Sequence, residues 1–171
     1  MVGKRPNLES AFGHHIWATD VLLDACCKLT LDQIFLEQPG VFGSVMATMR
    51  HIADGDLFFL GILCPELLVH TVVDDMNLEE VRKVLAHVAR VWQVYLSQDW
   101  DPGTQIRERE SNGYARDASI SIGLVQALHH GTDHRSQVCT MLSRLGVEPP
   151  IIDGWEFGLQ RGLIRENFPS K

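Results

Sequence analysis

The segment LHHGTDHRSQ, residues 128–137, is the most informative stretch of the sequence. It places His130 and His134 four residues apart, which puts both side chains on one face of an α-helix, one turn apart. The same face continues through small and apolar residues, namely Ala127, Gly131, Val138, Met141 and Leu145. Because an amphipathic helix turns such a stripe toward the core, we expect both imidazoles to point inward.

Two imidazoles on a buried face need partners, because an unpaired polar group in a protein interior costs about 1–3 kcal/mol. A transition-metal ion bound by both rings would satisfy them. Backbone groups, water or the other histidines could also satisfy them, and an ion could merely join the helices. The spacing alone therefore leaves these interpretations open.

The pattern of apolar residues predicts four long helices, and the two histidines lie on the last of them. That helix is expected from about Ser119 to Leu145, because Gly146 and Pro149-Pro150 follow. Asn7, Ser44 and Asn77 are the expected N-caps of the other three. These three are placed at about Leu8–Leu29, Ser44–Leu63 and Leu78–Ser97.

The connections between these helices contain little regular structure. Thr30–Gly40 is expected to be a polar loop, and Asp99–Ser119 a stretch that includes a short β-hairpin. A short final helix capped by Asp153 is expected over Asp153–Glu166. The fold class is therefore all-α: a four-helix bundle with a short hairpin between its third and fourth helices and a short C-terminal helix.

Length and composition fit one domain over residues 1–171, with its core at about residues 8–146 and a C-terminal extension at 147–171. The chain has 171 residues, 45% of them hydrophobic, which is enough for a substantial core. Its net charge is −7 and no long run of Lys or Arg occurs, so nucleic acid is not expected as a partner. With no signal-like start and no apolar stretch of ~20 residues, we expect a cytoplasmic protein without a membrane partner.

The four cysteines show no zinc-binding spacing. Cys26, Cys27, Cys64 and Cys139 lie within apolar helical patterns, so we interpret them as buried free thiols. Cys139 is about 140° around the helix from His134 and is a poor candidate ligand.

His51, on the second predicted helix, is our choice for a third ligand. It shares a helical face with small and apolar residues, so its imidazole is also expected to point toward the interior. The other residues on that face are Ala47, Thr48, Gly55, Phe58 and Ile62.

Several of these segments, in this order, resemble the DinB/YfiT-like family from about Leu8 to Asp153. They are Trp17-Ala18, Phe42-Gly43-Ser44 leading to Met49-Arg50-His51-Ile52, the segment His130–Gln137, Leu142–Gly146 and Pro149-Pro150. The resemblance implies a four-helix bundle in which three histidines bind a divalent metal, one on the second helix and two on the last. It also implies a homodimer.

Carried over residue by residue, the metal ligands of that family fall on His51, His130 and His134. Arg135 and Gln137 match its His-Arg-Gly-Gln segment. The chain departs from the pattern at Ser136, which replaces the usual glycine, and at Asp133, where a further histidine is common. Neither change removes a ligand, but each affects the pocket wall or the groups around the ligands.

His14-His15 is a further departure, because a Tyr-Asn pair is more common there in the family. His15 is a candidate pocket residue, although the sequence favours a surface histidine. Asp54 and Asp133 are candidate acceptors for the second nitrogen of a ligating ring, although solvated helix residues are the more common case. We also expect Gly55 and Gly131 to provide space near the ligands.

Three neutral imidazoles leave a divalent ion with at least one open coordination position, as in catalytic metal sites. The expected ion is zinc or nickel first, then iron or manganese. The resemblance implies a metal-dependent enzyme, such as an S-transferase that uses a low-molecular-weight thiol, or a hydrolase. The alternative is a noncatalytic metal-binding bundle with a stress-response or structural role. A di-iron bundle is disfavoured because the Glu-x-x-His pairs are missing.

Overall fold

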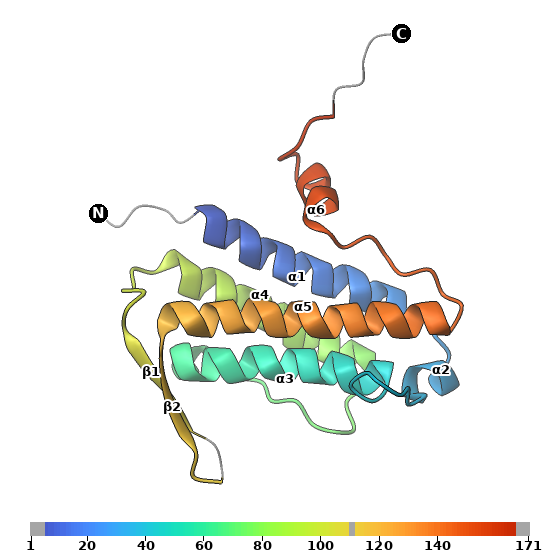
Figure 1. The fold of residues 1–171 in the computed structure, drawn as a ribbon, viewed down its shortest axis with the longest axis horizontal. Coiled ribbons are helices and arrows are strands. Elements are labelled where there is room, and N and C mark those ends of the chain that lie inside the picture. Colours follow the sequence, from blue (N-terminus) through green and yellow to red (C-terminus); the bar gives the residue numbers. More distant parts are fainter. Residues whose placement is uncertain (1–5, 110–111, 167–171) are drawn as a thin grey trace.

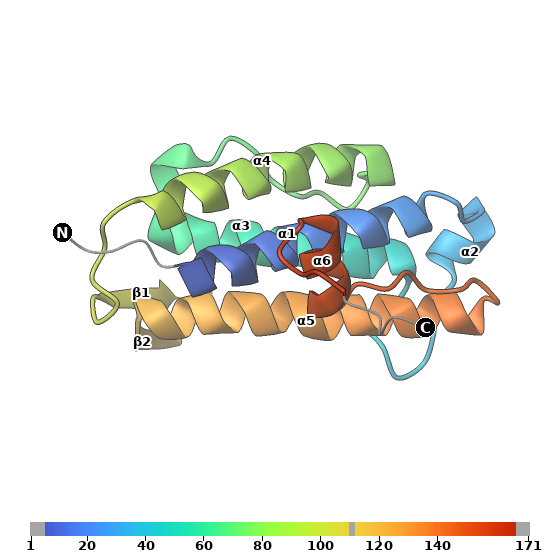
Figure 2. The ribbon, with the colours of Figure 1, turned by 90° about the horizontal axis from the view of Figure 1, so that it is seen from above.

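A computed structural model describes residues 6–109 and 112–166 and shows four long helices lying side by side (Figure 1). Helix α3 packs along α5, while α1 contacts both α4 and α5. The same arrangement is seen from above in Figure 2. The prediction of an all-α four-helix bundle is therefore confirmed. The four helices are α1 (Pro6–Cys26), α3 (Val45–Leu63), α4 (Leu78–Ser97) and α5 (Ile120–Arg144).

Local capping explains where three of these helices begin or end. The Ser44 side chain accepts a hydrogen bond from the Ala47 N–H and starts α3. Asn77 and Glu80 form a capping box that starts α4. Helix α5 ends just before Gly146, whose φ of +74° favours glycine. The predicted bounds of these three helices agree with the structure to within one residue.

The first helix differs slightly from its prediction. Helix α1 begins at Pro6, so Asn7 lies within the helix and is not its N-cap. Proline suits the first helical position because its missing N–H would have no partner inside the helix. The helix ends at Cys26, three residues before the predicted end.

The predictions from the sequence missed two short elements and gave a third the wrong bounds. The predicted loop at 30–40 contains α2 (Leu31–Phe35), which is started by a capping box between Thr30 and Gln33. A 3₁₀ turn, η1 (Pro65–Leu67), follows α3. Helix α6 (Gly154–Gln160) is capped by Asp153 as predicted but is shorter than 153–166. The chain turns at Gly162, with φ +66°, and Leu163 N–H donates to Gly158 O at 2.8 Å.

The predicted hairpin is present between α4 and α5. Its strands, β1 (Gln105–Arg109) and β2 (Ala115–Ser119), pair antiparallel, with Ile106 opposite Ala118 and Glu108 opposite Arg116. Because side chains alternate along a strand, these four residues share one face of the hairpin. We call it the hairpin face.

The core lies between the four long helices. Trp92 of α4 is fully buried, and its ring lies 4.5 Å from that of Phe12 of α1. Helix α6 packs on α1 through Phe157 and Trp17, whose ring centroids are 5.4 Å apart. Across residues 6–109 and 112–166, no helix combines the length and apolarity needed to cross a bilayer.

Candidate metal centre

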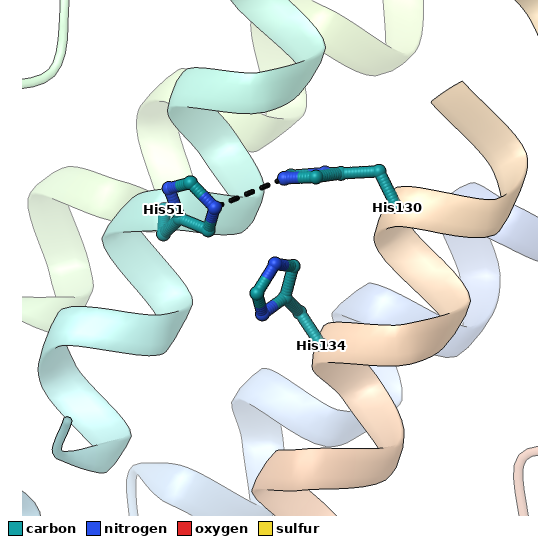
Figure 3. A group of neighbouring side chains, drawn as sticks. All are labelled: His51, His130 and His134. Atoms are coloured by element: carbon teal, nitrogen blue, oxygen red, sulfur yellow. Dashed lines mark hydrogen bonds between the residues drawn. The ribbon is translucent and has the colours of Figure 1, made fainter. Parts of the chain in front are cut away.

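Three histidines from two neighbouring helices converge at the interface between α3 and α5. His51 lies on α3, and His130 and His134 lie one turn apart on α5. Figure 3 shows the three rings turned toward one another across this interface. The sequence predicted this convergence because each histidine lies on the apolar face of its helix.

The nitrogen atoms are close enough to share one ion. One ring nitrogen from each histidine lies within 4.8 Å of the other two, and His51 Nε2 and His130 Nε2 are 3.1 Å apart. Two nitrogen ligands at 2.0–2.1 Å from a tetrahedral zinc ion would be about 3.3 Å apart. The donor set and its spacing therefore fit a divalent ion held by three imidazoles.

The protein itself does not satisfy all three rings. His51 and His130 share a hydrogen bond, and Gln137 lies close enough to His134 to act on its pKa, but no hydrogen bond of good geometry reaches the buried Nδ1 of His134 from the described residues. Buried polar atoms in native proteins are nearly always paired. The hydrogen bonds within the protein therefore satisfy the cluster only in part, and a metal ion or water would be the partner of the remaining nitrogens.

Burial keeps the three imidazoles in the form that binds metals. It lowers the pKa of His51 and of His134, and it lowers the pKa of His130 to about 4, with a further decrease from the neighbouring histidines. A group with a pKa well below 7 is unprotonated at neutral pH. Because a protonated imidazole cannot coordinate a metal, the lowered pKa values favour binding.

A loop residue that the sequence analysis did not select covers one side of the centre. The Phe42 ring stacks on His51 at a centroid distance of 4.1 Å and meets His134 edge-on at 5.4 Å. Gln137 Oε1 accepts a hydrogen bond from Phe42 N–H at 2.9 Å, and Thr48 Oγ1 donates to Phe42 O at 2.6 Å. Gln137, a predicted pocket residue, therefore fixes the loop that places Phe42.

Two glycines provide the space that the histidines occupy. A Cβ atom on Gly55 would lie 2.2 Å from His130 Cε1, and one on Gly131 would lie 2.4 Å from His15 Cε1. Cβ atoms essentially never approach other atoms this closely. Gly55 therefore makes room for His130, as expected, whereas Gly131 makes room for His15, which is not one of the three clustered histidines.

The two carboxylates near the ligands in sequence lie at the surface. Asp54 and Asp133 are exposed, and within the described part of the chain neither hydrogen bonds to the three rings. Their negative charges only partly offset the lowered pKa values of His51 and His134. The structure therefore places both as solvated helix residues.

His15 is buried, which corrects the expectation of a surface position. Its exposed fraction is 2%, and its Nε2 lies 3.1 Å from both carboxylate oxygens of Asp56. Arg135 Nη1 lies 3.1 Å from His15 Nδ1. Because a guanidinium only donates, Nδ1 accepts and Nε2–H donates to Asp56. Arg135 thus contacts this network and not the three-histidine cluster.

The network joins all four long helices behind the three histidines. Trp92 Nε1 donates to Asp56 Oδ1 at 3.0 Å, and Arg135 also donates to Thr19 Oγ1 at 3.1 Å. The role of Asp56 was not predicted, although the sequence contains an indication of it. It lies on the helical face of Ile52 and Leu60, where an acidic residue would need a buried partner.

Comparison with known proteins gives one result on the family and one on curated relatives. The sequence model of the DinB family matches residues 5–161. No curated protein matches the chain.

Proposed function

The chain belongs to the DinB family, and from this premise we propose that it is a metal-dependent enzyme whose ion is held by His51, His130 and His134. The observation that carries the proposal is the convergence of three neutral imidazoles, with one ring nitrogen of each within 4.8 Å of the other two. Such a donor set suits zinc or nickel first, and iron or manganese after them.

The number of ligands supports catalysis more than a purely structural role. Closed structural zinc sites use four protein ligands, whereas catalytic sites use three and keep a position for water or substrate. A divalent ion bound there would supply Lewis-acid activation of water, a thiol or a carbonyl oxygen. His51, His130 and His134 would hold it, while Phe42 would shield one side of the ligands from solvent.

We propose thiol-dependent S-transfer as the reaction, with hydrolysis as the second candidate. In the first, a low-molecular-weight thiol loses its proton to water and its sulfur forms a bond to an electrophilic carbon. The bond between that carbon and the leaving group breaks, and the leaving group departs with the bonding electrons. The thiolate is the nucleophilic form, so a site that favours it accelerates this step. Such thiols are kept reduced in the cytoplasm, which is the compartment that we propose for the protein.

We also propose that the protein is a homodimer, an expectation that comes from the family. Sedimentation of the untagged chain tests it directly. A mass of one chain at micromolar concentration would contradict it.

Elemental analysis tests the metal centre. Protein without a polyhistidine tag should carry about one transition-metal ion per chain, and the His130→Ala/His134→Ala variant should carry almost none, because one remaining imidazole binds weakly. The matched control is His129→Ala, which removes an exposed histidine from the same helix. Equal metal content in all three proteins would overturn the site.

Activity assays then separate an enzyme from a noncatalytic metal-binding bundle. The metal-loaded protein is supplied with a low-molecular-weight thiol and an activated aryl halide, and with activated esters and amides. Thiol consumption or hydrolysis that disappears in the double variant would support catalysis. Full metal content with no turnover of either substrate type would favour the stress-response or structural alternative.

A further inference from the structure

A cavity lies near the histidine cluster, where the hairpin meets α3 and α5. Its volume is about 180 Å³, and it is lined mainly by apolar side chains, namely Phe58, Phe59, Ile62, Ile106, Ala118 and Ile122. Glu108 and Arg116, which form an ion pair across the hairpin, also line it. The hairpin face identified above therefore closes one side of this cavity.

The cavity is next to the metal ligands along the same pair of helices. Phe59, which lines it, has its ring centroid 6.1 Å from that of His130. Gln126, another lining residue, precedes His130 by one helical turn on α5. Gly123 precedes His130 by seven residues, or about 10 Å along the helix axis. The cavity therefore begins one to two helical turns of α5 away from His130.

Apolar side chains remain exposed where this cavity opens. Phe58 is 44% exposed and Ile122 is 58% exposed. Hydrophobic pockets with a few placed polar groups are typical of small-molecule sites. Because these side chains form a hollow beside metal-binding nitrogens, the occupant that fits them has a polar end and an apolar end.

We propose that this cavity binds the apolar part of the substrate whose polar end is held at the three-histidine centre. This inference rests on the proposed metal function and adds the substrate class: an elongated small molecule with a metal-binding group and an apolar group. Taking ~30 Å³ for each water-sized group, the cavity holds about six of them. The apolar part thus corresponds to a short alkyl chain or one aromatic ring.

The test uses straight-chain hydroxamic acids, from acetohydroxamic to octanohydroxamic acid, titrated by calorimetry into the metal-loaded full chain. Each buried methylene contributes about a fourfold gain in affinity. Some methylenes only span the distance to the cavity, so octanohydroxamic acid should bind at least about 30-fold more tightly than acetohydroxamic acid.

Two variants fill the cavity without touching the histidines. Ala118→Phe adds a ring from β2, and Gly123→Leu adds a side chain from α5 that needs Ile106 to move, since a Cβ there lies 3.0 Å from Ile106 Cδ1. In each variant, the ratio of the affinity for octanohydroxamic acid to that for acetohydroxamic acid should fall at least about tenfold, while the affinity for acetohydroxamic acid itself stays unchanged. The matched control is Ala115→Phe, on the opposite face of the same strand, which should behave like the parent.

The possible outcomes are distinguishable. If no hydroxamic acid binds, the metal centre itself is wrong. If all bind equally, the metal centre stands and the cavity proposal is overturned. The cavity proposal is also overturned if affinity rises with chain length as steeply in both filling variants as in the parent. If, in addition, the filling variants sediment as monomers while the parent sediments as a dimer, the cavity face contacts a second copy of the chain, and the proposal is again overturned.

Discussion

Gly55 lies directly against the imidazole of His130, so closely that a Cβ atom at position 55 would be 2.2 Å from His130 Cε1. The two residues are on different helices, and the contact holds the His130 ring in place from α3. A glycine inside a helix costs about 0.5–1 kcal/mol relative to alanine. The structure gives the reason for this cost, because only glycine lets His130 occupy its position.

Gly55→Ala should therefore weaken metal binding at least about tenfold, because it displaces one of three ligands. Affinity is measured by competition with a chromogenic chelator. The matched control is Gly61→Ala on the same helix, where the added Cβ would meet Leu68 Cδ1 at an ordinary 3.7 Å. Equal affinities in the two variants would contradict the role assigned to Gly55.

Phe42 should control how quickly the ion is lost. Its ring stacks on His51, and removing it in Phe42→Ala would open that ligand to water and to chelators. We expect metal release to an excess of chelator to accelerate about threefold to tenfold, with little change in unfolding free energy, since Phe42 is 44% exposed.

Gln137→Ala should show part of the same effect, because Gln137 fixes the backbone of Phe42 through the bond to its N–H. Phe35→Ala, which removes another half-exposed phenylalanine from α2, serves as the control. Release rates that match the parent in both Phe42→Ala and Gln137→Ala would show that the loop does not shield the centre.

The long helices and the three histidines could be predicted because both depend on local pattern. Apolar spacing identifies the inward face of each helix, and Ser44 and Asn77 mark where two helices begin. Helix α2 could not be found in the same way, because five residues give too short a pattern to show a helical period. Its only signal was the Thr30–Gln33 capping pair.

The His15–Asp56 pair could not be predicted because it depends on how α1 and α3 are rotated against each other. His15 was a candidate pocket residue, but the sequence favoured a surface position for it. Phe42 was missed for a similar reason, because the position of a loop ring depends on the tertiary hydrogen bond to Gln137.

The buried network predicts a large loss of stability on removal of one charge. Arg135 has an exposed fraction of 3%, and His15 lies between its guanidinium and the Asp56 carboxylate. Asp56→Ala would therefore leave Arg135 buried without that carboxylate. Removing one member of a buried charge network typically costs about 3–5 kcal/mol. We expect a loss of about 3 kcal/mol in urea unfolding.

The control is Asp54→Ala, two residues away on the same helix but exposed, which should change the unfolding free energy by no more than about 0.5 kcal/mol. The additional substitution Arg135→Met in the Asp56→Ala background should recover part of the loss, because it removes the unpaired charge. Similar unfolding free energies for Asp56→Ala and Asp54→Ala would show that the network does not stabilise the fold.

Acid should destabilise the metal-free protein through His130. Burial lowers its pKa to about 4 in the folded chain, against the ordinary value of 6.5. As the pH falls below about 6.5, the unfolded chain takes up the proton first, and the folded chain does so only near pH 4. The neutral His130 ring therefore makes its full contribution to the free energy of unfolding above about pH 6.5. That contribution is lost progressively as the pH falls toward 4.

The lowered pKa values of His51 and His134 act in the same direction. Because the cluster is partly exposed, protonation of His130 should lower the free energy of unfolding by on the order of 1–2 kcal/mol. Urea unfolding of the metal-free chain at about pH 7.5 and about pH 5 measures it against His130→Gln, which does not titrate in this range. Because carboxylates affect both proteins alike, the parent should lose more stability than the variant. An equal loss in both would mean that the folded chain protonates His130 as readily as the unfolded chain does, and would contradict the lowered pKa.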